Sequence, residues 1–256
     1  MLLLLIPVFL VIGSGNIRSE FGNIPSFDQI AKALTEKKYK LVTITHVDTS
    51  TGVLTPIKEI SALIHEKSPE SLIAIDGVCS VAAEEIKQSE WGLDVVLTAS
   101  QKAIGVPPGL ALLVLSERAT KVALEKSKPT SYFASLKKWI PIMRNYEAKK
   151  NSYFATPPVQ LVLSLEESLK QILAEGLNAR FAKHVTESNR IKDAVEAEGL
   201  KLVPKSREIA AHSLSAVYFP EGANGPEFVK TIVSDGIMIA GGLHPVHGSE
   251  YFRIGH

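Results

Sequence analysis

Three apolar segments, each followed by a polar residue at nearly equal intervals, constrain the fold of this chain most strongly. The segments are rich in β-branched and aliphatic side chains, typical of buried strands, and span residues 41–47, 72–75 and 93–97. The polar residues that follow them are Thr49, Asp76 and Lys102. Each interval is close to the roughly 30 residues that one strand–helix–strand unit takes. We therefore expect three parallel strands that end at one edge of a sheet.

Helical patterns lie between and after these strands. Ser26 can cap a helix over 26–36, and Thr55-Pro56 opens another over 55–67. A short helix is predicted over 81–88, a buried strand over 109–115 and a helix over 117–128. Because the strand segments show little alternation, we expect a mostly parallel α/β sheet covered by helices on both faces.

The second half of the chain is predicted to add a long connection, two helices and a small domain. Residues 131–155 show no periodicity and are predicted to form a loop, before helices over 157–176 and 177–198. Short strands are predicted over 200–204, 212–219, 237–240 and 251–254, with a helix over 226–234. We expect a large domain over 21–176, and a long helix with a small α+β domain over 177–256.

The N-terminus differs from the rest of the chain. Residues 1–20 begin with the apolar run Leu2–Ile12, which is shorter than the roughly 20 residues of a bilayer span. The run fits a signal-peptide core or a buried strand equally well. The single Cys79 favours a reducing, intracellular compartment, and leaves the cytoplasm, a peroxisome or a mitochondrion open.

Charge and ligand spacing narrow the class of partner. The chain has 28 basic and 27 acidic side chains and a net charge of +1, so nothing indicates a nucleic-acid or membrane partner. No Cys and His spacing predicts a metal site. The composition is that of an ordinary globular protein.

Lys102 carries the chemistry that this sequence suggests. Held at the end of a buried strand, a lysine is desolvated, which favours the neutral, nucleophilic amine of Schiff-base lysines. A strand-end carboxylate such as Asp76 can hold the pyridine nitrogen of pyridoxal 5′-phosphate protonated. Taken alone, each residue also fits a purely structural role: Lys102 as a surface lysine in a turn, and Asp76 as a capping or turn aspartate.

Three separated motifs carry a family resemblance. They are His46–Leu54 (HVDTSTGVL), Ile75–Ser80 (IDGVCS) and Ser100–Ala103 (SQKA). Together they resemble the class V aminotransferases, in particular the alanine–glyoxylate and serine–pyruvate branch in its fungal form. The similarity covers roughly residues 22–254 and implies the fold type I architecture of pyridoxal-phosphate-dependent transferases, with a small C-terminal domain.

The resemblance implies a role for each matched residue. Lys102 would be the catalytic Schiff-base lysine, and Arg253 would bind the substrate carboxylate. The cofactor-binding residues would be Thr49, Asp76, Val78, Gln101 and Lys102, joined by Tyr153 and Thr156, which would reach the partner's site in a homodimer. The implied activity is ping-pong transfer of an amino group from alanine or serine to glyoxylate or a similar 2-oxo acid.

The chain also departs from the family pattern. The glycine-rich turn that cradles the cofactor phosphate is not found, and Gly13-Ser14-Gly15 lies too close to Lys102 to replace it. We expect a truncated family member whose activity is doubtful. One alternative is a non-catalytic remnant or dimerisation partner. Another is a cysteine desulfurase-like lyase of the same fold.

Overall fold

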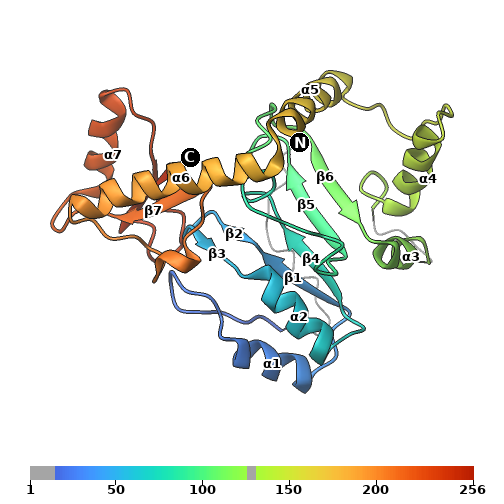
Figure 1. The fold of residues 1–256 in the computed structure, drawn as a ribbon, viewed down its shortest axis with the longest axis horizontal. Coiled ribbons are helices and arrows are strands. Elements are labelled where there is room, and N and C mark those ends of the chain that lie inside the picture. The colour runs from blue at the N-terminus through green and yellow to red at the C-terminus, as the bar shows by residue number, and fades with distance from the viewer. Residues whose placement is uncertain (1–14, 126–130) are drawn as a thin grey trace.

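The described residues form a four-stranded sheet, a three-stranded sheet and a two-stranded hairpin. A long helix, α6 (Leu177–Ala197), begins beside the end of the larger sheet and extends over the three-stranded one (Figure 1). The computed structural model describes residues 15–125 and 131–256. The strands of the larger sheet are, in spatial order, β1 (Leu41–Thr45), β4 (Leu72–Asp76), β5 (Val95–Ala99) and β6 (Ala111–Leu115). β1, β4 and β5 are parallel, and β6 is antiparallel to β5, which confirms the mostly parallel α/β sheet.

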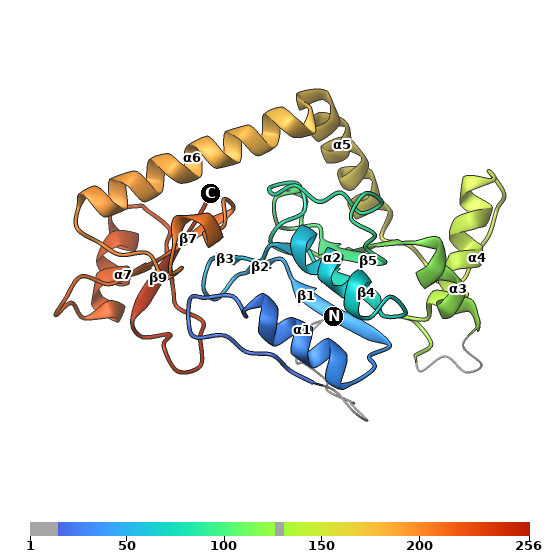
Figure 2. The same ribbon diagram turned by 60° about the horizontal axis from the view of Figure 1, so that its bottom comes forward.

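Two helices cover one face of this sheet, as Figure 2 shows. They are α1 (Phe27–Glu36) and α2 (Ile57–Lys67), close to their predicted bounds. Ser26 begins α1 with a capping box, because its side chain accepts from the Gln29 amide while Gln29 accepts from the Ser26 amide. The core that these elements bury includes Leu34, Ile64 and Ile75.

The expectation that helices cover both faces of the sheet is wrong for its outer strands. β4 is buried along most of its length, but β1 alternates between exposed and half-buried residues. Val42 and Ile44 of β1 pack toward α1 and α2, while Leu41 on the other face is 48% exposed. On the antiparallel edge strand β6, Val114 is 59% exposed. An apolar composition alone does not say how many faces of a strand are covered.

The first predicted strand is divided in two. β1 ends at Thr45, and a small antiparallel hairpin follows, made of β2 (Val47–Asp48) and β3 (Val53–Leu54). The amide of His46 still donates to the carbonyl of Asp76 at 3.0 Å, so the chain leaves the sheet only after this residue. Thr49 therefore lies in a hairpin turn rather than directly at a strand end.

Two further predictions of local structure are wrong. Residues 81–88 form turns instead of a helix. Within the predicted loop 131–155 lies α4 (Leu136–Glu147), which has no buried residue and contains Pro141. Leu136, Trp139, Ile140 and Met143 recur at helical spacing, so the sequence does contain a helical pattern here, and the prediction of a loop overlooked it. α3 (Glu117–Glu125) confirms the start of the preceding helix, and residues 126–128 of that prediction lie outside the described residues.

The remaining elements follow the prediction more closely. α5 (Val159–Glu175) and α6 (Leu177–Ala197) meet at Gly176. After a 3-10 turn (Arg207–Ile209), the second sheet has the order β7 (Leu214–Tyr218), β9 (Tyr251–Gly255), β8 (Ala240–Gly241), with α7 (Gly225–Ser234) beside it. The predicted strand 200–204 is reduced to one bridge, between Leu202 and Val217.

The two sheets suit the predicted large and small domains, whose boundary at 176/177 stays a prediction. The atypical segment 1–20 lies mostly outside the described residues. Within the described part of the chain, no helix has the length and apolar character needed to cross a bilayer.

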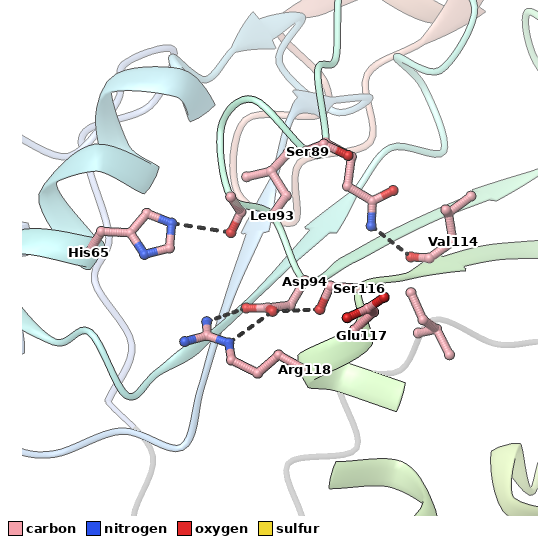
Figure 3. A pocket seen from close by; sticks show the side chains of 11 residues that line it. His65, Ser89, Leu93, Asp94, Val114, Ser116, Glu117 and Arg118 are labelled. Atoms are coloured by element: carbon pink, nitrogen blue, oxygen red, sulfur yellow. Dashed lines mark hydrogen bonds and ion pairs between the residues drawn. The ribbon is translucent and has the colours of Figure 1, made fainter. Parts of the chain in front are cut away.

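A cavity of about 480 Å³ lies at the amino end of β5, away from Lys102 (Figure 3). Its wall includes Asp94, whose carboxylate accepts from the amide of Ile73, from the hydroxyl of Ser116 and from the guanidinium of Arg118. Burial raises the pKa of Asp94, but these hydrogen bonds and the charge of Arg118 hold it below its ordinary value. The cluster ties β4, β5 and α3 together.

We expect Arg118→Met to destabilise the fold by about 2 kcal/mol, because it leaves the Asp94 carboxylate buried without its cation. Arg118 is partly exposed, which keeps the loss below that of a fully buried pair. Urea unfolding measures the change. Lys121→Met on the same helix is the matched control, since Lys121 is 78% exposed and pairs only with exposed Glu125. Equal effects of both substitutions would contradict this role of Asp94.

Buried His46 makes the fold sensitive to acid. Burial lowers its pKa to about 4, although the charge of Glu84 opposes this. Between pH 6.5 and 4 the unfolded chain binds a proton at this residue that the folded chain does not, so the free energy of unfolding falls as pH drops through that range, by up to about 3 kcal/mol. Urea unfolding at pH 7 and pH 5 tests this. We expect His46→Asn to reduce the dependence, with the remainder coming from His256, whose pKa burial also lowers to about 4, and an unchanged slope would contradict it.

Candidate functional site

A pocket of about 280 Å³ lies between the carboxyl end of β5 and the second sheet. It brings together three of the predicted site residues, Thr49, Lys102 and Arg253. They come from the β2–β3 turn, from the loop after β5 and from β9. The rest of the lining consists of Cys79, Ala103, Ser213, Leu214, Ala240, Ile254, Gly255 and His256.

The turn that carries Thr49 is organised by Asp48. The carboxylate of Asp48 accepts from the Ser50 amide and hydroxyl, at 2.9 and 2.7 Å, and from the Thr51 hydroxyl at 2.7 Å. Gly52 completes the turn with φ +70°, a conformation that glycine adopts without strain. Asp48 was not among the predicted site residues, although an aspartate before Ser-Thr-Gly is a typical turn signal.

Arg253 links the second sheet to this turn. Its Nη1 donates to the carbonyl of Thr49 at 3.2 Å, and its Nε donates to the carbonyl of Gly241 at 2.9 Å. Two of its donor groups are therefore used in fixing the side chain at the pocket wall. Nη2 makes no hydrogen bond within the described residues, so a guanidinium donor remains for a ligand.

The Lys102 loop is closed by the buried Ser100. Its hydroxyl donates to the carbonyl of Pro107 at 2.8 Å and accepts from the amide of Leu110 at 3.3 Å. The Gly105 amide then donates to the carbonyl of Lys102. Lys102 lies in this loop, lines the pocket and is exposed. The expectation that Lys102 is desolvated at the strand end is wrong for this chain, because β5 ends at Ala99 and the lysine lies beyond it.

Asp76 and Val78 lie near the pocket but do not line it. Asp76 ends β4, and its Oδ1 accepts from the Val78 amide at 3.0 Å. Its Oδ2 accepts no hydrogen bond from the residues that the structure describes. Cys79, the next residue after Val78, does line the pocket. The structure thus brings the turn after Asp76 to the pocket through Cys79, but not the Asp76 carboxylate itself.

The other predicted residues lie on exposed surface. Gln101 precedes Lys102 and is exposed. Tyr153 and Thr156 share a hydrogen bond of 2.6 Å between their hydroxyl groups, and Tyr153 is 70% exposed. Neither of these two residues lines the pocket within this chain.

Buried charges that no sequence pattern predicted hold the segment that leads into β7. Lys192 of α6 is 2% exposed and donates to the carbonyls of Ala210 and Ala211. Burial, with a smaller effect of the Arg207 charge, lowers the pKa of Lys192 to about 8. From the other side, buried Glu84 accepts from the amide and Nδ1 of His212. The segment 210–212 then delivers Ser213 and Leu214 to the pocket.

The polar character of the pocket is cationic. Its lining holds Lys102 and Arg253 and no acidic side chain among the described residues. Burial, then the nearby Lys192, lowers the pKa of His256 to about 4, so this side chain is neutral at pH 7. Ser213 Oγ and His256 Nδ1 are buried without a hydrogen-bond partner in the described structure.

Comparisons with known proteins bear on this arrangement. The family model for class V aminotransferases matches residues 19–252. An alanine–glyoxylate aminotransferase of Saccharomyces cerevisiae is 46% identical, over 93% of this chain and 62% of that protein. A serine–glyoxylate aminotransferase of Arabidopsis thaliana is 32% identical, over 94% of this chain and 59% of that protein. The chain thus spans about 60% of the length of these relatives.

Comparison with solved structures shows a matching fold. The crystal structure of an alanine–glyoxylate aminotransferase from a Nostoc species superposes with a TM-score of 0.83 at 24% identity, over 91% of this chain and 60% of that one. The architecture is that of the fold type I transferases, as the sequence predicted. With its motifs, its fold and the family match over most of its length, this chain belongs to the class V aminotransferases.

Proposed function

We propose that this chain carries the lysine and carboxylate-binding parts of an aminotransferase site. The proposed reaction moves an amino group from alanine or serine to glyoxylate or a similar 2-oxo acid. The observation that carries the proposal is that Lys102 and Arg253, 151 residues apart in the sequence, line one pocket. The yeast and plant relatives are named for transfer of an amino group from alanine or serine to glyoxylate, which supports these substrates.

Pyridoxal 5′-phosphate fits the residues of this pocket. A cationic lining with no acid suits an anionic ligand, and the unpartnered Ser213 Oγ and His256 Nδ1 are free to bind polar groups. Lys102 would hold the cofactor covalently, and Thr49 and Gln101 would bind it. Asp76 has a free carboxylate oxygen for the ring nitrogen, and Val78 would pack against the ring.

When bound, the cofactor supplies an electron sink that takes up the electron pair of the substrate carbon. The chain's own residues then divide the remaining work. Arg253 binds the substrate carboxylate and orients the carbon that loses its proton. The Lys102 amine takes this proton and returns it, as a general base and acid. Asp76 keeps the ring nitrogen protonated through its charge.

A second copy of the chain is part of this proposal. Tyr153 and Thr156 are exposed and hydrogen-bonded to each other, and they line neither of the two pockets described above. We propose that they reach the cofactor phosphate of a partner in a homodimer. Two neighbouring hydroxyl groups are suitable donors for a phosphate.

A non-catalytic remnant or dimerisation partner is the second candidate function. One observation favours it: Lys102 is exposed rather than desolvated. The desulfurase-like alternative has less support. Cys79 lies in the turn after β4 and packs against the cluster of Val47, Ala211 and Leu214, which does not suit a mobile nucleophile.

The lysine is tested by adding pyridoxal 5′-phosphate to the purified chain. We expect a visible imine absorbance, which borohydride fixes on the Lys102 peptide in mass spectrometry, because an amine in a cationic pocket captures an anionic aldehyde. Lys102→Met removes the band. Exposed Lys183 serves as the control, since Lys183→Met leaves the band unchanged. Label spread evenly over surface lysines would contradict the proposal, and a specific band without turnover would favour the remnant.

The carboxylate role is tested by Arg253→Lys. Lysine keeps the charge but loses the planar fork, so we expect KM for alanine and glyoxylate to rise by about 10- to 100-fold. The borohydride label on Lys102 should remain, because the substitution does not touch the amine. Arg190→Lys on exposed surface is the control. An unchanged KM with a lost label would show that Arg253 acts on the fold rather than on the substrate.

A further inference from the structure

A second arginine, outside the pocket, holds the Lys102 loop from α6. Arg180 lies near the start of α6, and its Nη2 donates to the carbonyl of Ala103 at 2.6 Å. Its Nε donates to the carbonyl of Ala82 at 2.8 Å. The remaining Nη1 forms an ion pair with Glu175 at 2.9 Å. One rigid guanidinium thus joins two loops that are far from it in the sequence.

Both loops reach the pocket. Ala103 follows Lys102 directly and lines the pocket itself. Ala82 lies in the turns between Cys79, another lining residue, and Glu84, which binds His212. Because the guanidinium is planar and its donors point in fixed directions, it sets the distance between these two carbonyl groups.

The conformation of Ala82 indicates that this contact holds the loop. Its φ is +71°, in the left-handed region that non-glycine residues rarely adopt. Such a conformation persists only where the surroundings over-determine it. The Arg180 bond to its carbonyl is one such restraint, and the Ala83 and Glu84 amides, which donate to the carbonyl of Ser80, are another.

The Lys102 loop also depends on contacts from outside. Ser100 fixes the base of the loop, but the carbonyls near its tip are satisfied by other helices. Ser168 of α5 donates to Ile104, and Arg180 of α6 donates to Ala103. Of these two contacts, the one that Arg180 makes at Ala103 is next to Lys102 in the sequence. Because the guanidinium is charged, its hydrogen bond is stronger than that of the Ser168 hydroxyl.

We propose that Arg180 is a positioning residue for Lys102, holding the lysine loop against the loop after Asp76. The inference rests on the proposed function, since it assigns a purpose to the fixed position of Lys102. Arg180 touches neither the pocket nor a substrate. It acts through the backbone of Ala103 and Ala82.

The test uses four variants of the full chain. Arg180→Met removes the charge and both loop bonds, and Arg180→Lys keeps the charge with a single donor group. Glu175→Gln removes only the ion pair. Arg190→Met, on the same helix but 80% exposed at its side chain, is the matched control. Circular dichroism and urea unfolding establish which variants are folded.

The first readout is hydrogen–deuterium exchange without cofactor. We expect Arg180→Met to speed exchange about tenfold or more in the segments 80–84 and 102–106, corresponding to about 1.4 kcal/mol of lost protection. Arg190→Met and Glu175→Gln should leave these segments unchanged. The inference would be overturned if Arg180→Met speeds exchange over the whole chain, or if it does not speed exchange in these two segments.

The second readout is the imine absorbance with pyridoxal 5′-phosphate, per folded chain. We expect Arg180→Met to weaken cofactor binding about tenfold and Arg180→Lys to restore part of it. A folded Arg180→Met that labels Lys102 like the unaltered chain would overturn the positioning role. If the unaltered chain itself forms no imine, the proposed function fails, and the exchange measurement still decides whether Arg180 holds both loops.

Discussion

The parallel register of β1, β4 and β5 is the constraint on which the candidate site depends. Thr45 pairs with Asp76, and Asp76 pairs with Leu97, so the chain leaves these three strands at one edge of the sheet. Thr49 and Lys102 follow the ends of β1 and β5 within a few residues, so they stay close to this edge. Thr49 and Lys102 therefore line the same pocket, although neither lies in a strand. The second sheet forms the opposite wall of this pocket.

The second sheet supplies that wall through polar contacts as well as apolar ones. Arg253 donates across to the Thr49 carbonyl, Glu84 binds His212, and Lys192 binds the carbonyls before β7. These groups are charged and at least partly buried, so each must keep its partner to offset desolvation. The same contacts that join the sheets thus fix the pocket wall, and a loss of one would alter the pocket together with the fold.

The sequence predicts the framework of this structure better than its details. Regular apolar spacing and Ser26 locate α1, and the strand segments locate β4 and β5, because local chemistry determines these elements. α4 could have been predicted from the helical spacing of Leu136, Trp139, Ile140 and Met143, although Pro141 argues against a helix there. The turn after β1 is signalled by Asp48 and Gly52, but the pairing of β2 with β3 is not. The exposure of Lys102 depends on how Ser100 closes a loop, and the roles of Glu84, Lys192 and Arg180 depend on contacts between distant segments. No local pattern encodes these.

The charge of the pocket limits what it can bind. Two cations line a space of about 280 Å³ with no acidic side chain among the described lining residues. His256 stays neutral because burial, and then the charge of Lys192, lower its pKa to about 4. Each uncompensated cation raises the free energy of the empty pocket, and an anion relieves it. A ligand with a carboxylate or a phosphate gains from this imbalance, whereas a simple amine gains nothing. In the proposed reaction, selectivity for amino acids and oxo acids over amines would therefore begin with charge, before Arg253 adds its geometry.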